Sequence, residues 1–295
     1  MGDAAGIGPE IVEAALSSSD LPRGCEYVVV GDYPDCTVGK PTAETARAAA
    51  AALEEAVQRA LRGEIAAVVT GPIHKARMYE IGFQFPGQTE FFAERCGVQN
   101  FAMLLTGGAL TVALVTSHIP LRRVAEVLSK EEIVRVGLLL SVFLHHRLGR
   151  VPRIAVAGLN PHAGESGALG SEETEIIVPA VETLRSTLNH LSRRSPSAKA
   201  DQPSTIFAGP FSPDTVFHRA VEGDWDGVLC MYHDQGLIPL KLHAFHAGVN
   251  VTLGLPFPRT SPDHGTAFEI AGKGIARPDS MIAALTLAAE LVAGK

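Results

Sequence analysis

Short apolar runs alternate with longer amphipathic stretches along this chain, and this alternation constrains its fold more than any other feature. Runs rich in Val, Ala, Ile and Leu occur at 66–70, 153–159 and 227–232, whereas stretches of helical length occur at 42–62 and 129–148. Strands that alternate with helices form parallel βα units, whose ligands bind at the carboxyl ends of the strands. The sequence therefore predicts an α/β fold with its functional residues just after the apolar runs.

The length and net charge of the chain limit the domain organisation and the kinds of ligand that we expect. At 295 residues it exceeds the length at which one core usually stops growing, which predicts two domains or one large α/β unit with lobes. A net charge of −7, with 25 Lys and Arg scattered along the chain, argues against a nucleic-acid partner. We therefore expect an anionic ligand to be small and locally held.

Cysteines and apolar stretches predict the compartment. The 4 cysteines form no CxxC pair, which disfavours a zinc knuckle and a disulfide framework. The longest apolar stretches, 136–144 and 281–292, are shorter than the roughly 20 residues that span a membrane. No basic-then-apolar signal opens the sequence. We expect a reduced, cytoplasmic protein without a membrane segment.

Three apolar runs end on a histidine within a turn. Three neutral imidazoles with an open position are typical of a catalytic divalent-metal site, and Asp214 or Asp234 would orient one ligand. The chain has 11 histidines, so this spacing alone is also compatible with chance. The three residues are His118 after 110–116, His162 after 153–159, and His233 after 227–232.

Other polar residues predict an anion site. Lys241, Asn250 and Arg259 lie in the turn-rich stretch 228–271 and together suit a carboxylate or phosphate, whereas Lys241 alone is compatible with a surface charge. The glycine-rich start, 2–10, offers backbone N–H groups to an anion or forms a plain turn.

The remaining expectations are structural. Residues 27–31 read as a buried strand, 102–105 and 110–116 as a hairpin, and 280–294 as a helix. The Pro/Ser-rich stretch 192–204 predicts a mobile surface loop.

Seven motifs, in this order, resemble the 4-hydroxythreonine-4-phosphate dehydrogenase family, and they cover nearly the whole chain. They are GDAAGIGPE, VTGPIHK, PGQTEFF, TSHIPL, GLNPHAGE, MYHDQGLIPLK and GVNVTLGLPFPRTSPDHGTAFEIAGKG. More distantly, GIGPE and HGTAFEIAGKGIARP resemble the isocitrate and isopropylmalate dehydrogenases. The resemblance implies two α/β domains with a cleft between them: a nucleotide-side domain of 1–75 with 240–295, and a metal and dimerisation domain of 76–239.

The resemblance also implies roles for single residues. The metal, zinc or alternatively cobalt, magnesium, manganese or nickel, would bind His118, His162 and His233. NAD or NADP would bind without a Rossmann fingerprint. The substrate contacts would be Gln88, Thr89, Lys241, Asn250 and Arg259; the cofactor contacts Gly6, Asp263, His264, Gly265, Thr266 and Ala267; and the catalytic groups Lys75, as a proton donor, and Asp214.

The implied activity is oxidative β-decarboxylation of 4-phosphohydroxy-L-threonine in pyridoxal phosphate biosynthesis, by a homodimer whose active site lies at the interface. Alternatives are a sibling dehydrogenase acting on 4-phosphothreonate, 4-phosphoerythronate or a cyclic dihydrodiol acid, a zinc hydrolase, and a non-catalytic binding protein.

The chain departs from the family pattern at several points. Gln88 replaces a histidine, which exchanges a titratable group for a neutral amide and keeps the sibling substrates open. Ala4 replaces a proline. The strand expected before Gly2 is absent from this sequence, and the stretch 33–41 is short.

Overall fold

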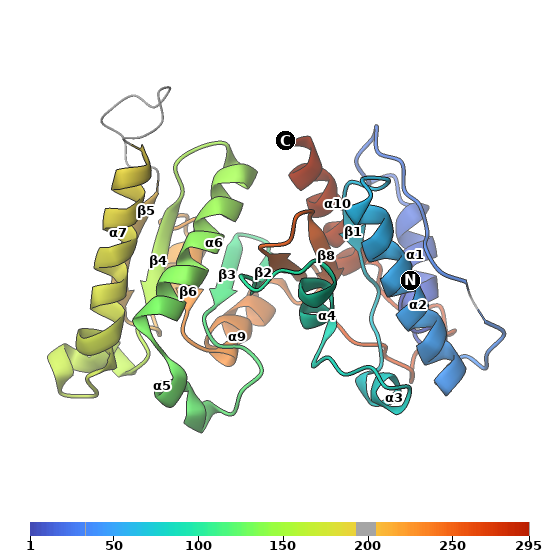
Figure 1. Ribbon diagram of the computed structural model, residues 1–295, viewed down its shortest axis with the longest axis horizontal. Coiled ribbons are helices and arrows are strands. Elements are labelled where there is room, and N and C mark those ends of the chain that lie inside the picture. The colour runs from blue at the N-terminus through green and yellow to red at the C-terminus, as the bar shows by residue number, and fades with distance from the viewer. Residues whose placement is uncertain (33, 193–204, 295) are drawn as a thin grey trace. The chain divides into compact units, whose positions relative to one another are not determined.

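The computed structural model describes residues 1–32, 34–192 and 205–294, so the predicted loop at 192–204 lies outside this part except for Ser192 (Figure 1). The chain divides into two compact units, the first of residues 1–99 with 246–293, and the second of residues 100–245. The predicted boundaries lie at 75/76 and 239/240. Residues 76–99 belong to the first unit because Met78, Phe91 and Phe92 pack into its core.

The first unit combines a small mixed sheet with helices. Strand β8 pairs in parallel with β1 and antiparallel with β7. Helix α10 packs against all three strands. The elements are α1 (Gly8–Leu16), α2 (Ala43–Leu61), β1 (Val68–Val69), α3 (Lys75–Glu80), α4 (Gln88–Arg95), β7 (Val249–Leu253), β8 (Arg259–Pro262) and α10 (Asp279–Ala293).

Helix α2 shows how local sequence sets these elements. The Thr42 hydroxyl accepts from the Thr45 N–H, and the Thr45 hydroxyl accepts from the Thr42 N–H, which forms a capping box at the predicted start. Ala46, Ala49 and Leu53 recur at helical spacing and are buried against the core. The predicted helix at 42–62 is confirmed, with ends one residue inside the expected ones.

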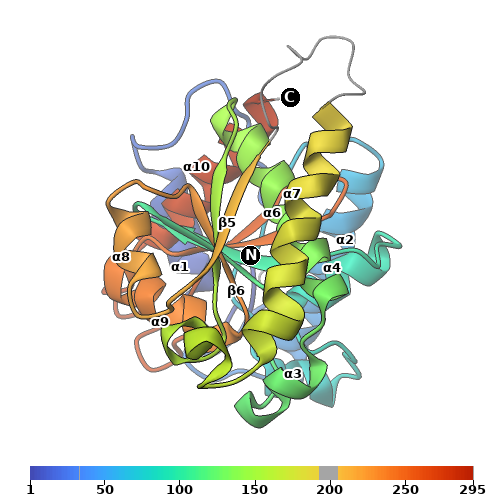
Figure 2. The same ribbon diagram turned by 90° about the vertical axis from the view of Figure 1, so that its left-hand side faces the viewer.

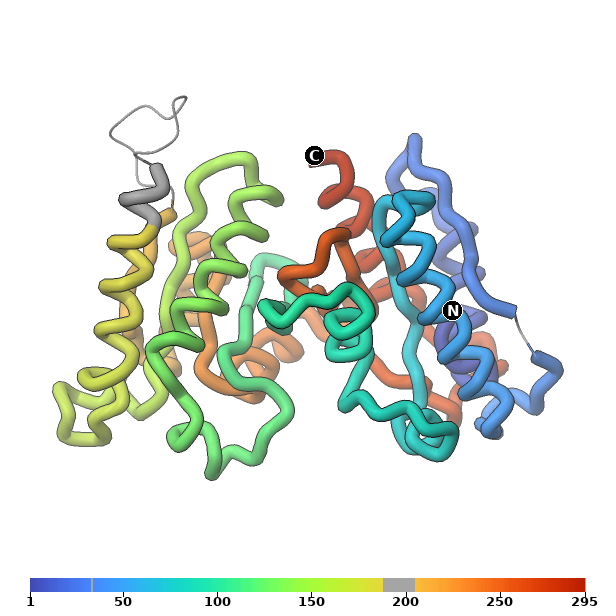
Figure 3. Tube along the Cα trace, viewed as in Figure 1, coloured from blue at the N-terminus to red at the C-terminus, as the bar shows by residue number. Residues whose placement is uncertain are grey.

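The predicted buried strand at 27–31 is wrong. These residues form no regular element, and Val28 and Val29 are 48% and 46% exposed. Residues 24–32 and 34–42 instead follow an irregular path (Figure 3). A strand needs a partner edge, yet β1, the nearby strand, is paired in the described chain only with β8. A cavity of about 540 Å³ separates residues 24–30 from 65–71 and α10.

The second unit is a five-stranded sheet in the order β2-β3-β6-β4-β5. Strands β2 and β3 form the predicted antiparallel hairpin, and the other neighbours are parallel. Helices α6 and α7 cover one face, and α8 and α9 cover the other (Figure 2). The elements are β2 (Ala102–Gly107), β3 (Leu110–Leu114), η1 (Leu121–Arg123), α5 (Val124–Val127), α6 (Lys130–Leu148), β4 (Arg153–Ala157), η2 (Pro161–Gly167), η3 (Glu173–Ile177), α7 (Val178–Ser192), β5 (Ile206–Phe211), α8 (Val216–Val221), β6 (Gly227–Cys230) and α9 (His233–Ala244).

The expectation of turns after β6 is wrong over α9, because His233–Ala244 is helical. Pro239 lies inside this helix, and its sequence gives almost no amphipathic signal. Leu237 and Leu240 are buried against the sheet and stabilise the helix despite the proline. His233 is therefore the first residue of a helix and not part of a free turn.

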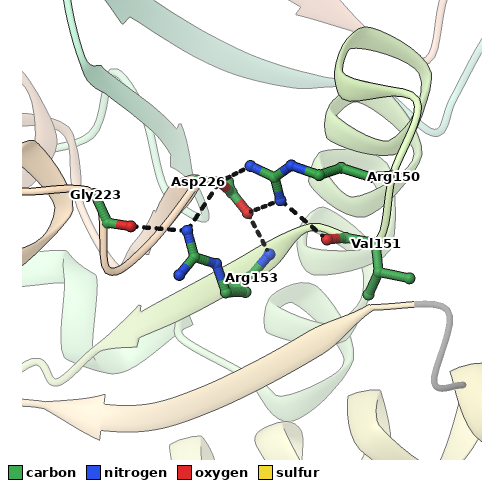
Figure 4. A network of polar contacts seen from close by, with 5 residues as sticks. All are labelled: Arg150, Val151, Arg153, Gly223 and Asp226. Carbon is green, nitrogen blue, oxygen red and sulfur yellow. Dashed lines mark hydrogen bonds and ion pairs between the residues drawn. The ribbon is translucent and has the colours of Figure 1, made fainter.

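An ion-pair network joins the amino ends of β4 and β6 (Figure 4). The Asp226 carboxylate accepts from the Arg150 guanidinium at 2.6 and 2.9 Å and from the Arg153 N–H at 2.7 Å. The Arg153 side chain donates to the Gly223 carbonyl at 2.7 Å. The two strands are thus fixed at the end opposite to their histidines.

No helix in the described ranges is both long and apolar enough to cross a membrane.

Candidate functional site

The three histidine-bearing segments of the second unit follow adjacent parallel strands. Strand β6 lies between β3 and β4, so the carboxyl ends of all three strands meet at one edge of the sheet. His118 follows β3, His162 follows β4 and His233 follows β6. The rings of His118 and His233 face each other with centroids 5.5 Å apart.

The segment that carries His162 is a left-handed turn. From His162 to Ser166, five consecutive residues have φ between 43° and 78°, and only one of them is glycine. This conformation costs on the order of 1–2 kcal/mol for each non-glycine residue, so the surroundings must hold it.

Glu173 holds this turn. Its side chain is buried, and its carboxylate accepts from the N–H groups of Leu159 and Asn160 at 2.7 Å each and from the Asn160 amide at 2.9 Å. Glu172 accepts a further bond from the Asn160 amide at 2.7 Å. The side chain of Asn160 and the backbone before His162 are therefore fixed from the start of η3.

Two carboxylates lie beside the histidines. Asp234 Oδ1 is 2.6 Å from His233 Nδ1, the contact by which a carboxylate orients a ligating ring. The Ser212 hydroxyl donates to Asp214 at 2.5 Å, and this bond, together with the nearby His162, lowers the pKa of Asp214. Asp214 is exposed, and it remains ionised at neutral pH.

The donor chemistry of these histidines fits a divalent ion, because neutral imidazoles suit zinc, cobalt and nickel. The positions of these side chains within one chain support a metal site less completely than their chemistry does. Within residues 1–32, 34–192 and 205–294, no three His, Cys, Asp or Glu side chains come together as a metal site. The structure brings the rings of His118 and His233 to a centroid distance of 5.5 Å, and the charge of His162 helps to lower the pKa of Asp214.

A buried cation is the centre of a second cluster, in the first unit. Arg259 is 2% exposed, and its guanidinium donates to the hydroxyls of Thr70 at 2.6 Å and Thr252 at 3.3 Å and to the Gln88 amide oxygen at 2.9 Å. Thr89 Oγ1 lies 3.4 Å from the Thr252 hydroxyl. Burial lowers the pKa of Arg259 to about 10, so the group remains cationic at neutral pH.

Only neutral groups hydrogen-bond to Arg259 in the described chain, and its Nε has no partner there. The Asn250 amide oxygen is also buried without a partner among these residues. A buried cation without a bonded anion suits a ligand carboxylate or phosphate. The Gln88 amide, however, uses both ends internally, because its nitrogen donates to the Gly71 carbonyl at 3.0 Å.

The predicted cofactor residues also lie together in the first unit. The Ile7 N–H donates to the Thr266 carbonyl at 2.9 Å, which joins the glycine-rich start to the 263–267 loop. A Cβ on Gly6 would lie 2.7 Å from the Thr266 oxygen, so only glycine fits there. His264 Nε2 is buried without a hydrogen-bond partner in the described chain. This loop therefore offers an unused polar atom.

The other predicted residues are distributed between the units. Lys75 is exposed at the start of α3 in the first unit, and Lys241 lies on α9 in the second. The sequence did not point to Thr252, although its position two residues after Asn250 on β7 places both on one face of the strand. It also gave no signal for Glu173, whose contacts are not apparent from spacing.

Comparisons with known proteins identify the family that this chain resembles in sequence. The sequence matches the family described as pyridoxal phosphate biosynthetic protein PdxA over residues 10–288. It is 43% identical over 336 aligned positions to a 4-hydroxythreonine-4-phosphate dehydrogenase of Caulobacter vibrioides, covering 99% of this chain and 96% of that protein.

Solved structures show the same similarity. A 4-hydroxythreonine-4-phosphate dehydrogenase from Klebsiella pneumoniae matches with a TM-score of 0.80 and 35% identity, covering 99% of this chain and 98% of that one. A terephthalate 1,2-cis-dihydrodiol dehydrogenase from Burkholderia xenovorans matches at 0.67 and 25%, covering 98% and 96%. A β-decarboxylating dehydrogenase from Thermococcus kodakarensis, at 0.54 and 17%, covers 99% and 82% and shares the fold. The predicted α/β class is confirmed.

Proposed function

Because this chain belongs to the family of the pyridoxal phosphate biosynthetic protein PdxA, we propose that it oxidises and decarboxylates 4-phosphohydroxy-L-threonine to 3-amino-2-oxopropyl phosphate. The observation that carries the proposal is the extent of the match. Residues 10–288 include the Arg259 cluster, the 263–267 loop and all three histidine-bearing segments. The enzyme is an oxidoreductase of the 4-hydroxythreonine-4-phosphate dehydrogenase type.

The reaction has two balanced steps. The C3 hydroxyl loses its proton and C3 loses a hydride, which reduces the nicotinamide and leaves a β-keto acid. The bond from C2 to the carboxylate then breaks, carbon dioxide leaves, and C2 takes up a proton. We assign the delivery of this proton to Lys75, and we assign Asp214, which is ionised, to the orientation of a histidine.

Binding is divided among the other residues. We assign the binding of the phosphate or carboxylate to Arg259, Asn250 and Thr89, and likewise to Lys241; the ligand would give the buried guanidinium a hydrogen-bonded anion in addition to the charge of Glu90. The 263–267 loop and Gly6 would hold the nicotinamide nucleotide, NAD or NADP, which would serve as the hydride acceptor. His118, His162 and His233 would hold a divalent ion, which would supply Lewis-acid stabilisation of negative charge on the substrate oxygen.

The homodimer is supported by an apolar stripe on α9. Ile238, Leu242 and Phe245 recur at the spacing of one helical face and are 66%, 89% and 70% exposed. Large apolar side chains in such a row mark a protein interface. The stripe begins five residues after His233, so a second copy covering it would bring its own donors close to the histidines. We infer that the metal site is completed across this interface.

Sedimentation and activity test the dimer. Leu242→Asp places a charge in the stripe and is expected to give an inactive monomer. Val142→Asp is the matched control, because Val142 is 69% exposed on α6, away from the stripe, and this variant is expected to remain dimeric. A Leu242→Asp protein that sediments as an active dimer would contradict the interface.

The substrate is tested by following NADH or NADPH absorbance with each metal ion in turn. The panel is 4-phosphohydroxy-L-threonine, 4-phosphothreonate, 4-phosphoerythronate and a cyclic dihydrodiol acid, and the first is expected to react fastest. Faster turnover of another member would identify a sibling dehydrogenase, which the replacement at Gln88 and the similarity to a dihydrodiol dehydrogenase keep in view. Absence of NADH binding in a fluorescence titration would favour a zinc hydrolase.

The cellular setting follows from the same observations. We propose a cytoplasmic location, which agrees with four free cysteines in the described chain. We propose no nucleic-acid partner, in agreement with the net charge of −7.

A further inference from the structure

The backbone of Met231, in the second unit, is hydrogen-bonded at its N–H and at its carbonyl by the buried side chains of Gln235 and Thr116. The Met231 N–H donates to the Gln235 amide oxygen at 2.6 Å, and the Gln235 amide nitrogen donates to the Gly158 carbonyl at 2.7 Å. Gln235 is 6% exposed and Met231 is fully buried. One glutamine therefore joins the carboxyl end of β6 to the carboxyl end of β4.

The Met231 carbonyl, in the next peptide unit, is joined to the segment after β3. The Thr116 hydroxyl donates to the Met231 carbonyl at 2.7 Å, next to the bond from the Thr116 N–H at 3.2 Å. Thr116 is 8% exposed. The Met231 backbone is therefore held at its N–H by the Gln235 amide, which also bonds Gly158 after β4, and at its carbonyl by the Thr116 hydroxyl after β3.

The positions of these bonds relate them to the histidines. Thr116 and Met231 each precede a histidine by two residues, His118 and His233 respectively. Gly158 precedes His162 by four residues. All three histidine-bearing segments are thus joined through the backbone N–H and carbonyl of Met231.

Glutamine suits position 235 because the two backbone groups that it bonds have opposite hydrogen-bonding requirements. The Met231 N–H requires an acceptor and the Gly158 carbonyl requires a donor, and an amide supplies both without a charge. Gly158 must also remain unsubstituted, because a Cβ there would lie 2.9 Å from Ala163 Cα and 3.1 Å from Glu173 Oε1. The backbone that enters the His162 turn is therefore packed and bonded at the same point.

We propose that Gln235 and Thr116 are positioning residues that set the spacing of the three histidine-bearing segments through the backbone N–H and carbonyl of Met231. They do not touch the substrate or ligate the metal. The inference rests on the proposed function for its consequence in metal binding, but not for its geometry, which belongs to the protein alone.

The experiment compares Gln235→Met and Thr116→Val, which remove these bonds at similar volume, with wild type. Thr116→Ser retains the hydroxyl and is the conservative rescue. Thr111→Val is the matched control, because Thr111 is a buried threonine of β3 whose hydroxyl pairs with Thr106. Thr116→Val keeps the test available if Gln235→Met does not fold.

Two measurements are made: Zn²⁺ affinity by calorimetry, and the ring nitrogen NMR signals of the histidines in metal-free protein. Gln235→Met and Thr116→Val are expected to weaken Zn²⁺ binding about tenfold or more and to shift or double the ring signals of His118, His162 and His233. Thr116→Ser and Thr111→Val are expected to match wild type in both.

Unchanged ring signals and Zn²⁺ affinity in Thr116→Val and Gln235→Met, with only a lower melting temperature, would overturn the proposal. If wild type itself binds no Zn²⁺, the proposed metal site fails, and the ring signals alone then decide whether these residues position the histidines.

Discussion

The two ends of the β4–β6 strand pair are held by different chemistry. At the amino ends, Asp226 binds Arg150 and Arg153, whose side chains are 52% and 41% exposed (Figure 4). At the carboxyl ends, the neutral and buried Gln235 binds the Met231 and Gly158 backbone. The two arginines of the amino end are about half exposed around an Asp226 side chain that is 9% exposed, whereas the bonds of the neutral Gln235 are buried near the candidate metal ligands.

The difference has an electrostatic reason. Exposed ion pairs contribute about 0–1 kcal/mol each, are screened by salt, and tolerate substitution. A buried donor or acceptor that loses its partner costs about 1–3 kcal/mol, so the neutral network fixes geometry more strictly. It also adds no charge that would compete with a metal ion for the histidines. Substitutions at the two ends should therefore differ in which property they change, stability alone or stability and metal binding, as well as in the size of the change.

The largest effect is expected from Glu173→Gln, at the histidine end. The new amide group replaces one carboxylate oxygen and leaves part of the Leu159 and Asn160 donors without an acceptor. The unfolding free energy should fall by about 1–3 kcal/mol and Zn²⁺ affinity by about 10–100-fold. Denaturant unfolding and calorimetry measure the two quantities.

Glu172→Gln is the matched control for this substitution, because Glu172 accepts from the Asn160 amide, whereas Glu173 accepts from that amide and from the N–H groups of Leu159 and Asn160. It is expected to keep most of the Zn²⁺ affinity. Equal losses in both variants would show that the turn is not held specifically by Glu173.

A smaller effect, on stability alone, is expected from Asp226→Asn at the opposite end. Burial raises the pKa of Asp226, but hydrogen bonds from Arg150 and Arg153 outweigh it, so the pKa is lowered in the folded protein. The carboxylate therefore stabilises the fold above the unfolded pKa of about 4 and loses this contribution as pH falls through the lower folded value.

Unfolding of Asp226→Asn and wild type, measured between neutral and acidic pH, should differ by about 1–2 kcal/mol at pH 7. The difference should shrink below about pH 4. Turnover per folded molecule should remain that of wild type. A loss of turnover at neutral pH would contradict the idea that the amino end of the strand pair affects stability but not activity.

The smallest effect is expected from Arg150→Met, because the arginine is half exposed and Arg153 continues to bind Asp226. The unfolding free energy should fall by about 0.2–1 kcal/mol at low ionic strength. The difference should largely disappear in 1 M salt, where the screening length is about 3 Å. A difference that persists in high salt would indicate that packing of the arginine stem, not charge, is lost.

Much of the second unit was predictable because its signals are local. Strands β3, β4 and β6 are continuous apolar runs, and the histidines follow them directly. The failures at 27–31 and α9 have tertiary causes. Residues 27–31 have strand-like composition but no partner strand, and α9 contains a proline but is stabilised by Leu237 and Leu240.

For the candidate site, the sequence suggested residues but did not predict the contacts that they make. Arg259 was found from its residue type and neighbours, yet Thr70 and Gln88, which bind it, precede it by 189 and 171 positions. Gln88 was expected to contact substrate, and the structure shows its amide bridging Arg259 and Gly71. Contacts between residues so far apart in the sequence leave no periodic pattern from which they could be predicted.

Local opening of the left-handed turn at His162 can be followed by amide hydrogen exchange. The Leu159 and Asn160 amides lie outside every helix and strand, and they are bonded to the buried Glu173. Their hydrogens can exchange with solvent only when the turn releases Glu173, since no other acceptor among the described residues protects them. The exchange rate of these two amides, compared with that of the β4 strand, separates the free energy of releasing His162 from that of unfolding the unit.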